Sequence, residues 1–531
     1  MGSFLGSGQL VRLILRLDRI RLLVWVLSLG LIPVAVASSF ATLYDTELAR
    51  RELVGTVVSS PGLTALLGPI SGTSVGALTA WRIGTIGGVL VALMAGFTVV
   101  RHTRQEEETG RRELLGSTVL GRHAPLLAAS LVTVVVGMLI GLIVTVGLVA
   151  LGEDAGGSVA FGLSWALVSV VFAAVGALAA QLTESSGGAR GIVAGTAGLF
   201  YALRMAGDAG EGSGVGWISW LSPLGWVSKL EAFGDERWWV VALFVVGGLI
   251  LGVVGFVLSA GRDVGAGFFA TRPGPPTASR GLSSPLGLAW RLQRGGVYGW
   301  SVGITLFAAV WGGLGNTITD LFEENPQLAS IFEALGGAGA LTDIFFSAAM
   351  GIVALIVSAY AISVTLTLRR EETELRAEHV LATPTPRLTW VWSHLTFALI
   401  VPTLLMSLAG IAAGLIHGAI VDDVPGWLGN LLGSSLLQVP AIWVVAGVVM
   451  VLYGVAPAFA SWSWAALVGF LLLGQLGPIL QLPQWAMNLS PFTHVPSPPE
   501  PISALPVLAL VSVSLLLLGI GLGGFRSRDL A

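Results

Sequence analysis

Apolar stretches of about 20 residues recur along the whole chain, separated by short polar segments. A stretch of this length without internal charges predicts a helix that spans a membrane. We predict twelve spans, of which the fifth is the shortest. They cover Leu22–Ala41, Ile83–Val100, Leu126–Val149, Ala160–Ala180, Gly191–Met205, Val240–Leu258, Val297–Gly315, Ile344–Leu366, Val391–Ile416, Leu428–Tyr453, Ser461–Leu480 and Leu505–Leu522.

One polar segment in the middle of the chain divides these spans into two sets of six. Residues 261–284 are rich in glycine, proline and serine and contain the run Arg272-Pro273-Gly274-Pro275-Pro276. Such a composition is typical of a linker. We therefore predict a first half over residues 1–260, a cytoplasmic linker over 261–284 and a second half over 285–531.

The composition supports a membrane protein and excludes several other classes. Of the 531 residues, 54% are hydrophobic and only 11% are charged, whereas a soluble domain carries about 25% charged residues. The 72 glycines fit closely packed membrane helices. The chain has no cysteine, so disulfides and thiolate metal sites are excluded. Its six histidines are scattered, and we expect no metal site.

The basic residues gather in alternate connections between the predicted spans. Most of the 27 lysines and arginines fall on the side that carries both termini. The positive-inside rule then places both termini in the cytoplasm of a multi-pass protein of the cell membrane. A cleaved signal peptide ending near Ala35-Val36-Ala37 is an alternative, but a similar arginine-rich segment recurs in mid-chain.

The two halves share sequence at matching positions. The matches lie before the first span, after the second span and at the end of each half, which indicates two parallel repeats related by an axis along the membrane normal. The matched pairs include Arg16/Arg291, Arg19/Arg294, Trp25/Trp300, Arg104/Arg369, Glu106/Glu371, Glu107/Glu372, Arg111/Arg376, Glu113/Glu378, Thr118/Thr383, Arg122/Arg387, Trp217/Trp485 and Arg262/Arg528. A duplication without a transport pathway remains the alternative interpretation.

An energy source is missing from the chain itself. The centres of the predicted spans hold no carboxylate or histidine for proton coupling. A phosphate-binding loop requires Gly-Lys-Ser/Thr, and the single lysine, Lys229, is followed by Leu230. If transport is active, another polypeptide must hydrolyse ATP.

Two charged connections, one after the second span of each half, are the candidate docking sites for that polypeptide. Each combines carboxylates with arginines, and the pairs Glu107/Arg111 and Glu372/Arg376 have the spacing of helical ion pairs. A solvated turn is the alternative for a single copy, but two matching copies favour recognition. The candidate docking residues are Glu106, Glu107, Glu108, Arg111, Glu113, Glu371, Glu372, Glu374, Arg376 and Glu378.

These features together resemble the permeases of type V ABC exporters. The resemblance rests on an amphipathic elbow segment, an external loop and the run Glu-Glu-Glu-Thr-Gly-Arg-Arg-Glu-Leu-Leu at 106–115. The fused halves are more similar to the twelve-span permeases of actinobacterial polyketide-antibiotic (tetronasin-type) exporters. The second copy ends Leu381-Ala382-Thr383-Pro384, whereas the first has Val119 in place of that proline.

The resemblance implies an all-α fold of twelve transmembrane helices in two six-helix pseudo-repeats, with amphipathic elbow helices. Residues 106–115 and 371–380 would be coupling helices on two copies of an ABC ATPase subunit. ATP and magnesium would bind in those partners, and this chain would hold no cofactor and would not be an enzyme. Segments 214–230 and 484–491 would be re-entrant or interfacial external helices.

The predicted function is the permease subunit of an ATP-driven exporter of lipophilic, drug-like or antibiotic molecules. The alternative is an ion-coupled secondary transporter of the major-facilitator type, which also has six-plus-six repeats. A path between the halves would be apolar, and single members of it could equally be packing residues. Its candidate residues are Met94, Phe97, Phe200, Tyr201, Met350, Phe470 and Gln475.

Overall fold

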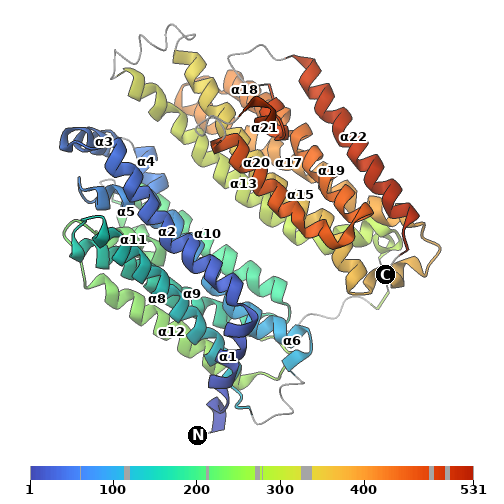
Figure 1. Ribbon diagram of the computed structural model, residues 1–531, viewed down its shortest axis with the longest axis horizontal. Coiled ribbons are helices and arrows are strands. Elements are labelled where there is room, and N and C mark those ends of the chain that lie inside the picture. The colour runs from blue at the N-terminus through green and yellow to red at the C-terminus, as the bar shows by residue number, and fades with distance from the viewer. Residues whose placement is uncertain are drawn as a thin grey trace. The chain divides into compact units, whose positions relative to one another are not determined.

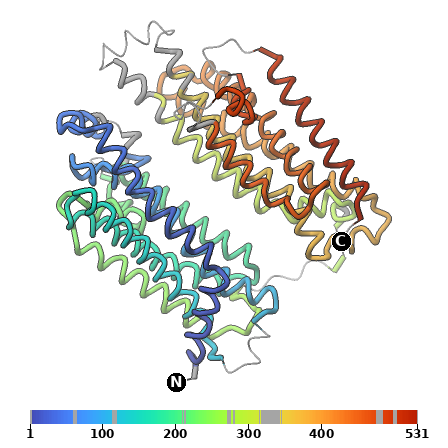
Figure 2. Tube along the Cα trace, in the orientation of Figure 1, coloured from blue at the N-terminus to red at the C-terminus, as the bar shows by residue number. Residues whose placement is uncertain are grey.

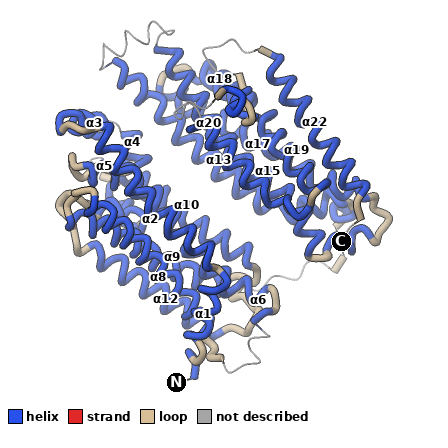
Figure 3. Tube along the Cα trace, in the orientation of Figure 1, coloured by secondary structure: helices blue, strands red, loops and turns tan. Residues whose placement is uncertain are grey.

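The computed structural model describes residues 2–59, 61–112, 120–210, 214–269, 276–277, 279–323, 338–476, 483–496 and 503–529. Within these ranges the chain forms helices joined by turns, without a β-strand (Figure 3). This confirms the all-α part of the prediction. The helices group into two units, Met1–Gly274 and Pro275–Ala531.

The first unit contains a set of long apolar helices with shorter helices at their ends (Figure 1). Polar caps begin several of the long helices: Ser74 Oγ accepts from the Ala77 amide at 3.0 Å, and Asp154 Oδ2 accepts from the Gly157 amide at 2.8 Å. These bonds satisfy amides that lack an intrahelical partner. The helices are η1 (Gly2–Phe4), α1 (Ser7–Leu17), α2 (Arg19–Leu43), α3 (Glu47–Ser59), α4 (Pro61–Leu67), α5 (Val75–Val100), the π-helical η2 (Arg101–Gln105), α6 (Glu106–Glu108), α8 (Ala124–Ala150), α9 (Ala155–Leu182), α10 (Ser186–Ala209), η3 (Gly216–Leu221), α11 (Pro223–Lys229) and α12 (Val240–Gly261).

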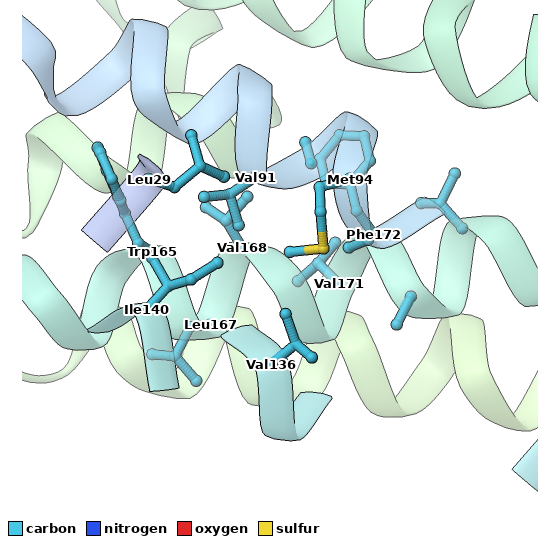
Figure 4. Close-up of a cluster of buried hydrophobic side chains, with 14 of the residues drawn as sticks. Leu29, Val91, Met94, Val136, Ile140, Trp165, Leu167, Val168, Val171 and Phe172 are labelled. Carbon is cyan, nitrogen blue, oxygen red and sulfur yellow. The ribbon is translucent and has the colours of Figure 1, made fainter. Parts of the chain in front are cut away.

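Helix α9 is the centre of this unit. In its most apolar window 83% of the residues are buried, against 22% for α12. Trp165 and Phe172 of α9 pack among side chains from α2, α5 and α8 (Figure 4). The Trp165 Nε1–H donates to the Gly84 carbonyl at 2.9 Å, so its single polar atom is satisfied.

Glycines allow α8 and α9 to touch through their backbones. A Cβ atom on Gly141 of α8 would collide with the carbonyl of Gly162 in α9, and the reverse also holds. In the second unit, a Cβ atom on Gly454 would meet the backbone of Gly521. Such small-residue contacts are typical of helices that associate in lipid.

The second unit repeats this construction with differences at its beginning and in its fourth long segment. A break at Gln438 divides that segment into α18 and α19. The helices are η4 (Arg280–Ser283), α13 (Pro285–Glu323), α15 (Ala338–Thr373), α16 (Arg376–Leu381), α17 (Arg387–Ile420), α18 (Val424–Leu437), α19 (Val439–Val455), η5 (Pro457–Trp462), α20 (Ser463–Leu476), α21 (Gln484–Met487), η6 (Pro491–His494) and α22 (Ala504–Ser527). Figure 2 follows their order along the chain.

Nine helical segments within the described residues are long and apolar enough to cross a membrane. This fits a polytopic membrane protein. The predicted fifth, seventh and eleventh spans fall on α10, α13 and α20, which are not among the nine. The nine are Arg19–Leu43, Val75–Glu108, Ala124–Ala150, Ala155–Leu182, Val240–Gly261, Phe345–Thr373, Arg387–Ile420, Val424–Val455 and Ala504–Ser527.

The two elbow segments differ from each other. In the first unit Asp18 separates α1 from α2, and its carboxylate contacts His102 at 2.8 Å and Arg101 at 3.1 Å. In the second unit α13 runs through the matching region as one helix of 39 residues. Among the described residues, the expected separate elbow helix is therefore found in the first unit alone, where Asp18 lies at the break and Gln293 is the matching residue of the second unit.

The Gly141 contact generates a stability prediction. We expect Gly141→Ala to lower the free energy of unfolding by about 1–3 kcal/mol, because the added methyl group forces α8 away from α9. Thermal unfolding in detergent measures the effect. Gly195→Ala in α10 is the control, since nothing lies within 4 Å of its Cβ position. Equal melting temperatures for the two variants would contradict the close contact.

Candidate functional site

A buried carboxylate lies where the second long helix of the first unit ends. Glu107 of α6 has no exposed side-chain surface, and three guanidinium groups surround it. Arg262, just after α12, donates from Nη1 to Oε2 at 2.9 Å and from Nη2 to Oε1 at 3.0 Å. Arg104 donates to Oε2 at 2.9 Å, and Arg112 forms a third ion pair. We call these four residues the first anchor.

The arginines of the first anchor also donate to backbone and side-chain oxygens at neighbouring helix ends. Arg104 donates to Ala180 O of α9 at 2.9 Å and to Ala266 O at 2.7 Å. Arg262 donates from Nε to Gln181 Oε1 at 2.6 Å. The first anchor therefore joins the ends of α5, α9 and α12 through charge-assisted hydrogen bonds, which are stronger than neutral ones.

The second unit contains the same central pair. Glu372, near the end of α15, accepts from Arg528 Nη1 and Nη2, both at 2.7 Å, in a bidentate contact. The Tyr453 hydroxyl at the end of α19 donates to Glu372 Oε2 at 2.8 Å. Arg528 also lies over the Tyr453 ring, 4.9 Å from its centroid. We call these three residues the second anchor.

The backbone carbonyls of the anchor residues Arg262 and Arg528 also accept corresponding hydrogen bonds. Arg122 donates to the Arg262 carbonyl at 2.6 Å, and its counterpart Arg387 donates to the Arg528 carbonyl at 3.2 Å. Each residue of these pairs occupies a matched position of the internal repeat. The repeat thus reproduces a set of contacts as well as a set of residues.

A left-handed turn follows each anchor. Gly110 has φ +71°, and the residue at the matching position, Leu375, has φ +58°. Glycine adopts this conformation freely, whereas a residue with a side chain is strained in it. The second copy therefore keeps the turn in spite of its leucine, and α16 begins directly after it.

The predicted docking residues are divided between buried and exposed positions. Glu107 and Glu372 are buried in the anchors. The predicted pairs Glu107/Arg111 and Glu372/Arg376 are wrong: Arg111 lies 3.5 Å from Glu106, and Arg376 lies 3.2 Å from Glu371. The left-handed residues Gly110 and Leu375 interrupt the helix between each glutamate and its arginine, so a spacing of four residues no longer places the two side chains on one helix face.

The other docking candidates are mostly exposed. Glu108 accepts from the Ser186 amide at 2.9 Å, at the start of α10. Glu374 pairs with Arg376, whose side chain is 52% exposed. Glu378 lies on the exposed face of α16. Glu113 lies outside the described residues.

The candidate path residues that the structure describes belong to the apolar cores of their own units, and Met94, Phe97, Phe200 and Tyr201 share the core of the first unit. Met94 is buried in the core of the first unit (Figure 4), and Met350 is buried in the core of the second. Phe97, Phe200, Tyr201 and Phe470 are half-buried. The side chain of Gln475 lies outside the described part of the chain.

A buried ionic cluster in α10 escaped the sequence analysis. Arg204 lies 3.4 Å from Asp208, and Lys229 of α11 lies 3.9 Å from the same carboxylate. Arg204 also donates to Thr85 Oγ1 at 3.1 Å and to Leu66 O at 3.0 Å. The signal was the Arg204/Asp208 spacing of four residues, which places both charges on one face of a helix. The predicted span stopped short of Asp208.

Long apolar helices, with ionic contacts concentrated towards their ends, define a multi-pass helical membrane protein. A family model described as multidrug efflux system permease Rv1217c, C-terminal domain, matches residues 282–526. The multidrug efflux system permease protein Rv1217c of Mycobacterium tuberculosis (strain ATCC 25618 / H37Rv) is 41% identical over 530 residues, covering 99% of this chain and 96% of that protein. The chain belongs to the family of permeases that includes Rv1217c.

The anchors generate the second prediction. We expect Glu372→Gln to lower the free energy of unfolding by about 3 kcal/mol, because it leaves the Arg528 guanidinium without its charged partner. Thermal unfolding of the purified chain measures the loss. Glu378→Gln, on the exposed face of α16, is the matched control and should change the stability by less than about 0.5 kcal/mol. Indistinguishable unfolding curves for Glu372→Gln and Glu378→Gln would refute a stabilising role for the second anchor.

Proposed function

We propose that this chain is the membrane permease subunit of an ATP-driven ABC exporter that moves lipophilic, drug-like or antibiotic molecules out of the cell. The full-length similarity to a multidrug efflux system permease carries this proposal. The resemblance to the tetronasin-type permeases supports the same substrate class. Nothing in the similarity favours the ion-coupled secondary transporter.

The energy for transport comes, in this proposal, from two copies of an ABC ATPase subunit. ATP and magnesium bind in those subunits, since this chain has no Gly-Lys-Ser/Thr sequence for a nucleotide phosphate. Two similar charged segments in one chain would provide one docking site for each copy. The permease itself is then a transport subunit and not an enzyme.

The anchors suggest how the docking segments work. Arg111 and Arg376 contact neighbouring glutamates but stay more than half exposed, so a partner surface can reach them. Glu107 and Glu372 instead tie the same segments to Arg262 and Arg528 at the ends of the last helices. A displacement of the docking segment would therefore be carried to the last helix of each half. We assign recognition to the exposed residues and transmission to the anchors.

Reversal of the exposed charges tests this assignment. Arg111→Glu combined with Arg376→Glu should abolish co-purification of the ATPase, because both side chains are more than half exposed and leave the anchors intact. The melting temperature of the chain should not change. Arg51→Glu in α3, where the arginine is 65% exposed, is the control. Full retention of the ATPase by the double variant would refute the docking assignment.

The proposed architecture has twelve spans in two parallel six-span repeats, divided into residues 1–260, a linker over 261–284 and residues 285–531. Both termini lie in the cytoplasm, as the distribution of arginines indicates. A reporter fused after Ala531 should then read as cytoplasmic, and one inserted between Asn325 and Pro326 as external. The same reading for both would disprove this topology.

The substrate path is proposed to run along apolar side chains of each half. An apolar lining suits lipophilic molecules. Phe97→Ala, Phe200→Ala and Phe470→Ala should each weaken the stimulation of ATP hydrolysis by lipophilic compounds about two- to tenfold, since an aromatic contact contributes about 0.5–1.5 kcal/mol. Basal hydrolysis by the assembled complex should persist. Unchanged stimulation in all three variants would place the path elsewhere.

A further inference from the structure

A cavity of about 680 Å³ lies between α1 and the first anchor. We call it the elbow cavity. All of its lining residues belong to the first unit. Its volume lies within the range of small-molecule sites, and neither the proposed function nor the relative's name assigns a ligand to it.

One wall of the elbow cavity is the apolar face of α1. Leu10, Leu13, Ile14 and Leu17 follow the spacing that places side chains on one face of a helix. Leu10 and Ile14 are buried, but Leu13 is 38% exposed and Leu17 is 63% exposed. This wall therefore offers apolar surface that the chain itself leaves partly uncovered.

Another wall of the cavity is basic. Arg112, Arg122 and Arg262 line it. The buried carboxylate behind them, Glu107, is shared with Arg104 as well. Two further carboxylates line the cavity, Glu106 and Asp263.

Positive charge exceeds negative charge around this wall. Glu106 is already paired with Arg111, and Glu107 is surrounded by three guanidinium groups. Burial, together with the nearby charges of Arg262, Arg104 and Arg122, lowers the pKa of Arg112 to about 10. An anion at the wall would relieve this repulsion.

We propose that the elbow cavity binds an anionic phospholipid. The phosphate group contacts Arg122 and Arg112, and an acyl chain lies against Leu13 and Leu17. A lipid fits better than a soluble phosphate, because only the lipid covers the apolar face of α1 as well. The amphipathic α1 next to the apolar α2 is also typical of a helix that lies at the membrane surface.

Native mass spectrometry of the full chain tests the proposal. The purified protein is mixed with phosphatidylglycerol or with phosphatidylcholine of the same acyl chains, and we expect it to retain phosphatidylglycerol preferentially. Arg122→Gln should weaken retention about fivefold, the fold-change that corresponds to ~1 kcal/mol per arginine. Arg122→Lys should keep most of it. Leu13→Asn should weaken retention about tenfold, because it removes the apolar contact.

The second half supplies matched controls. Arg387 is exposed like Arg122, and it donates to the carbonyl of Arg528 as Arg122 donates to that of Arg262. Leu288 is 37% exposed, which is close to the value for Leu13. Neither residue lines the elbow cavity, so Arg387→Gln and Leu288→Asn should retain phosphatidylglycerol like the parent.

Three outcomes would overturn the proposal. Equal retention of the two lipids would show that charge plays no part. Equal losses of phosphatidylglycerol from Arg122→Gln and from its control Arg387→Gln would show a general effect of surface charge. Complete displacement of the lipid by inorganic phosphate would identify a site for a soluble anion instead.

Discussion

The ends of the long helices in each unit depend on one buried carboxylate. A charge removed from water is costly unless it is paired and hydrogen-bonded. Glu107 and Glu372 meet that requirement through bidentate contacts from Arg262 and Arg528. Because Arg262 and Arg528 follow the last long helix of each unit, 155 and 156 residues after their glutamates, the carboxylate can be satisfied only when the ends of the second and last long helices meet. The pairing therefore couples a local charge requirement to the tertiary arrangement.

The two units share this pairing and differ in what surrounds it. The first anchor has two further arginines, and its Arg262 also contacts Gln181, whereas the second has the Tyr453 hydroxyl and ring. The elbow differs as well, since only the first unit has a helix break at Asp18 within the described residues. Two copies with the same central contact and different surroundings need not respond equally to a partner.

Charge is concentrated near the ends of helices in the first unit. The first anchor lies at one end of α5, and the Arg204 cluster lies near the last turns of α10. Between these ends, Met94, Trp165 and their neighbours form an apolar core (Figure 4). Ionic contacts at the helix ends keep charges out of the region where lipid offers no compensating solvent.

The sequence alone determined the class of this protein and showed matched positions in its two halves. Apolar length and low charge are sufficient to predict membrane helices, because lipid leaves the backbone few other ways to satisfy its hydrogen bonds. The matched pairs Glu107/Glu372 and Arg262/Arg528 were also visible. Their pairing was not, because nothing in a local pattern tells which distant helix end will supply the partner.

Only the tertiary structure decided which charges face inward. Spacing along a helix suggested Glu107 with Arg111, but the fold turned Glu107 towards Arg262 and left Glu106 for Arg111. The same limit hid the Arg204 cluster, whose polar partners include Thr85 and Leu66 from other helices. Local periodicity determines which residues share a helix face, whereas burial of that face depends on the neighbours that packing brings to it.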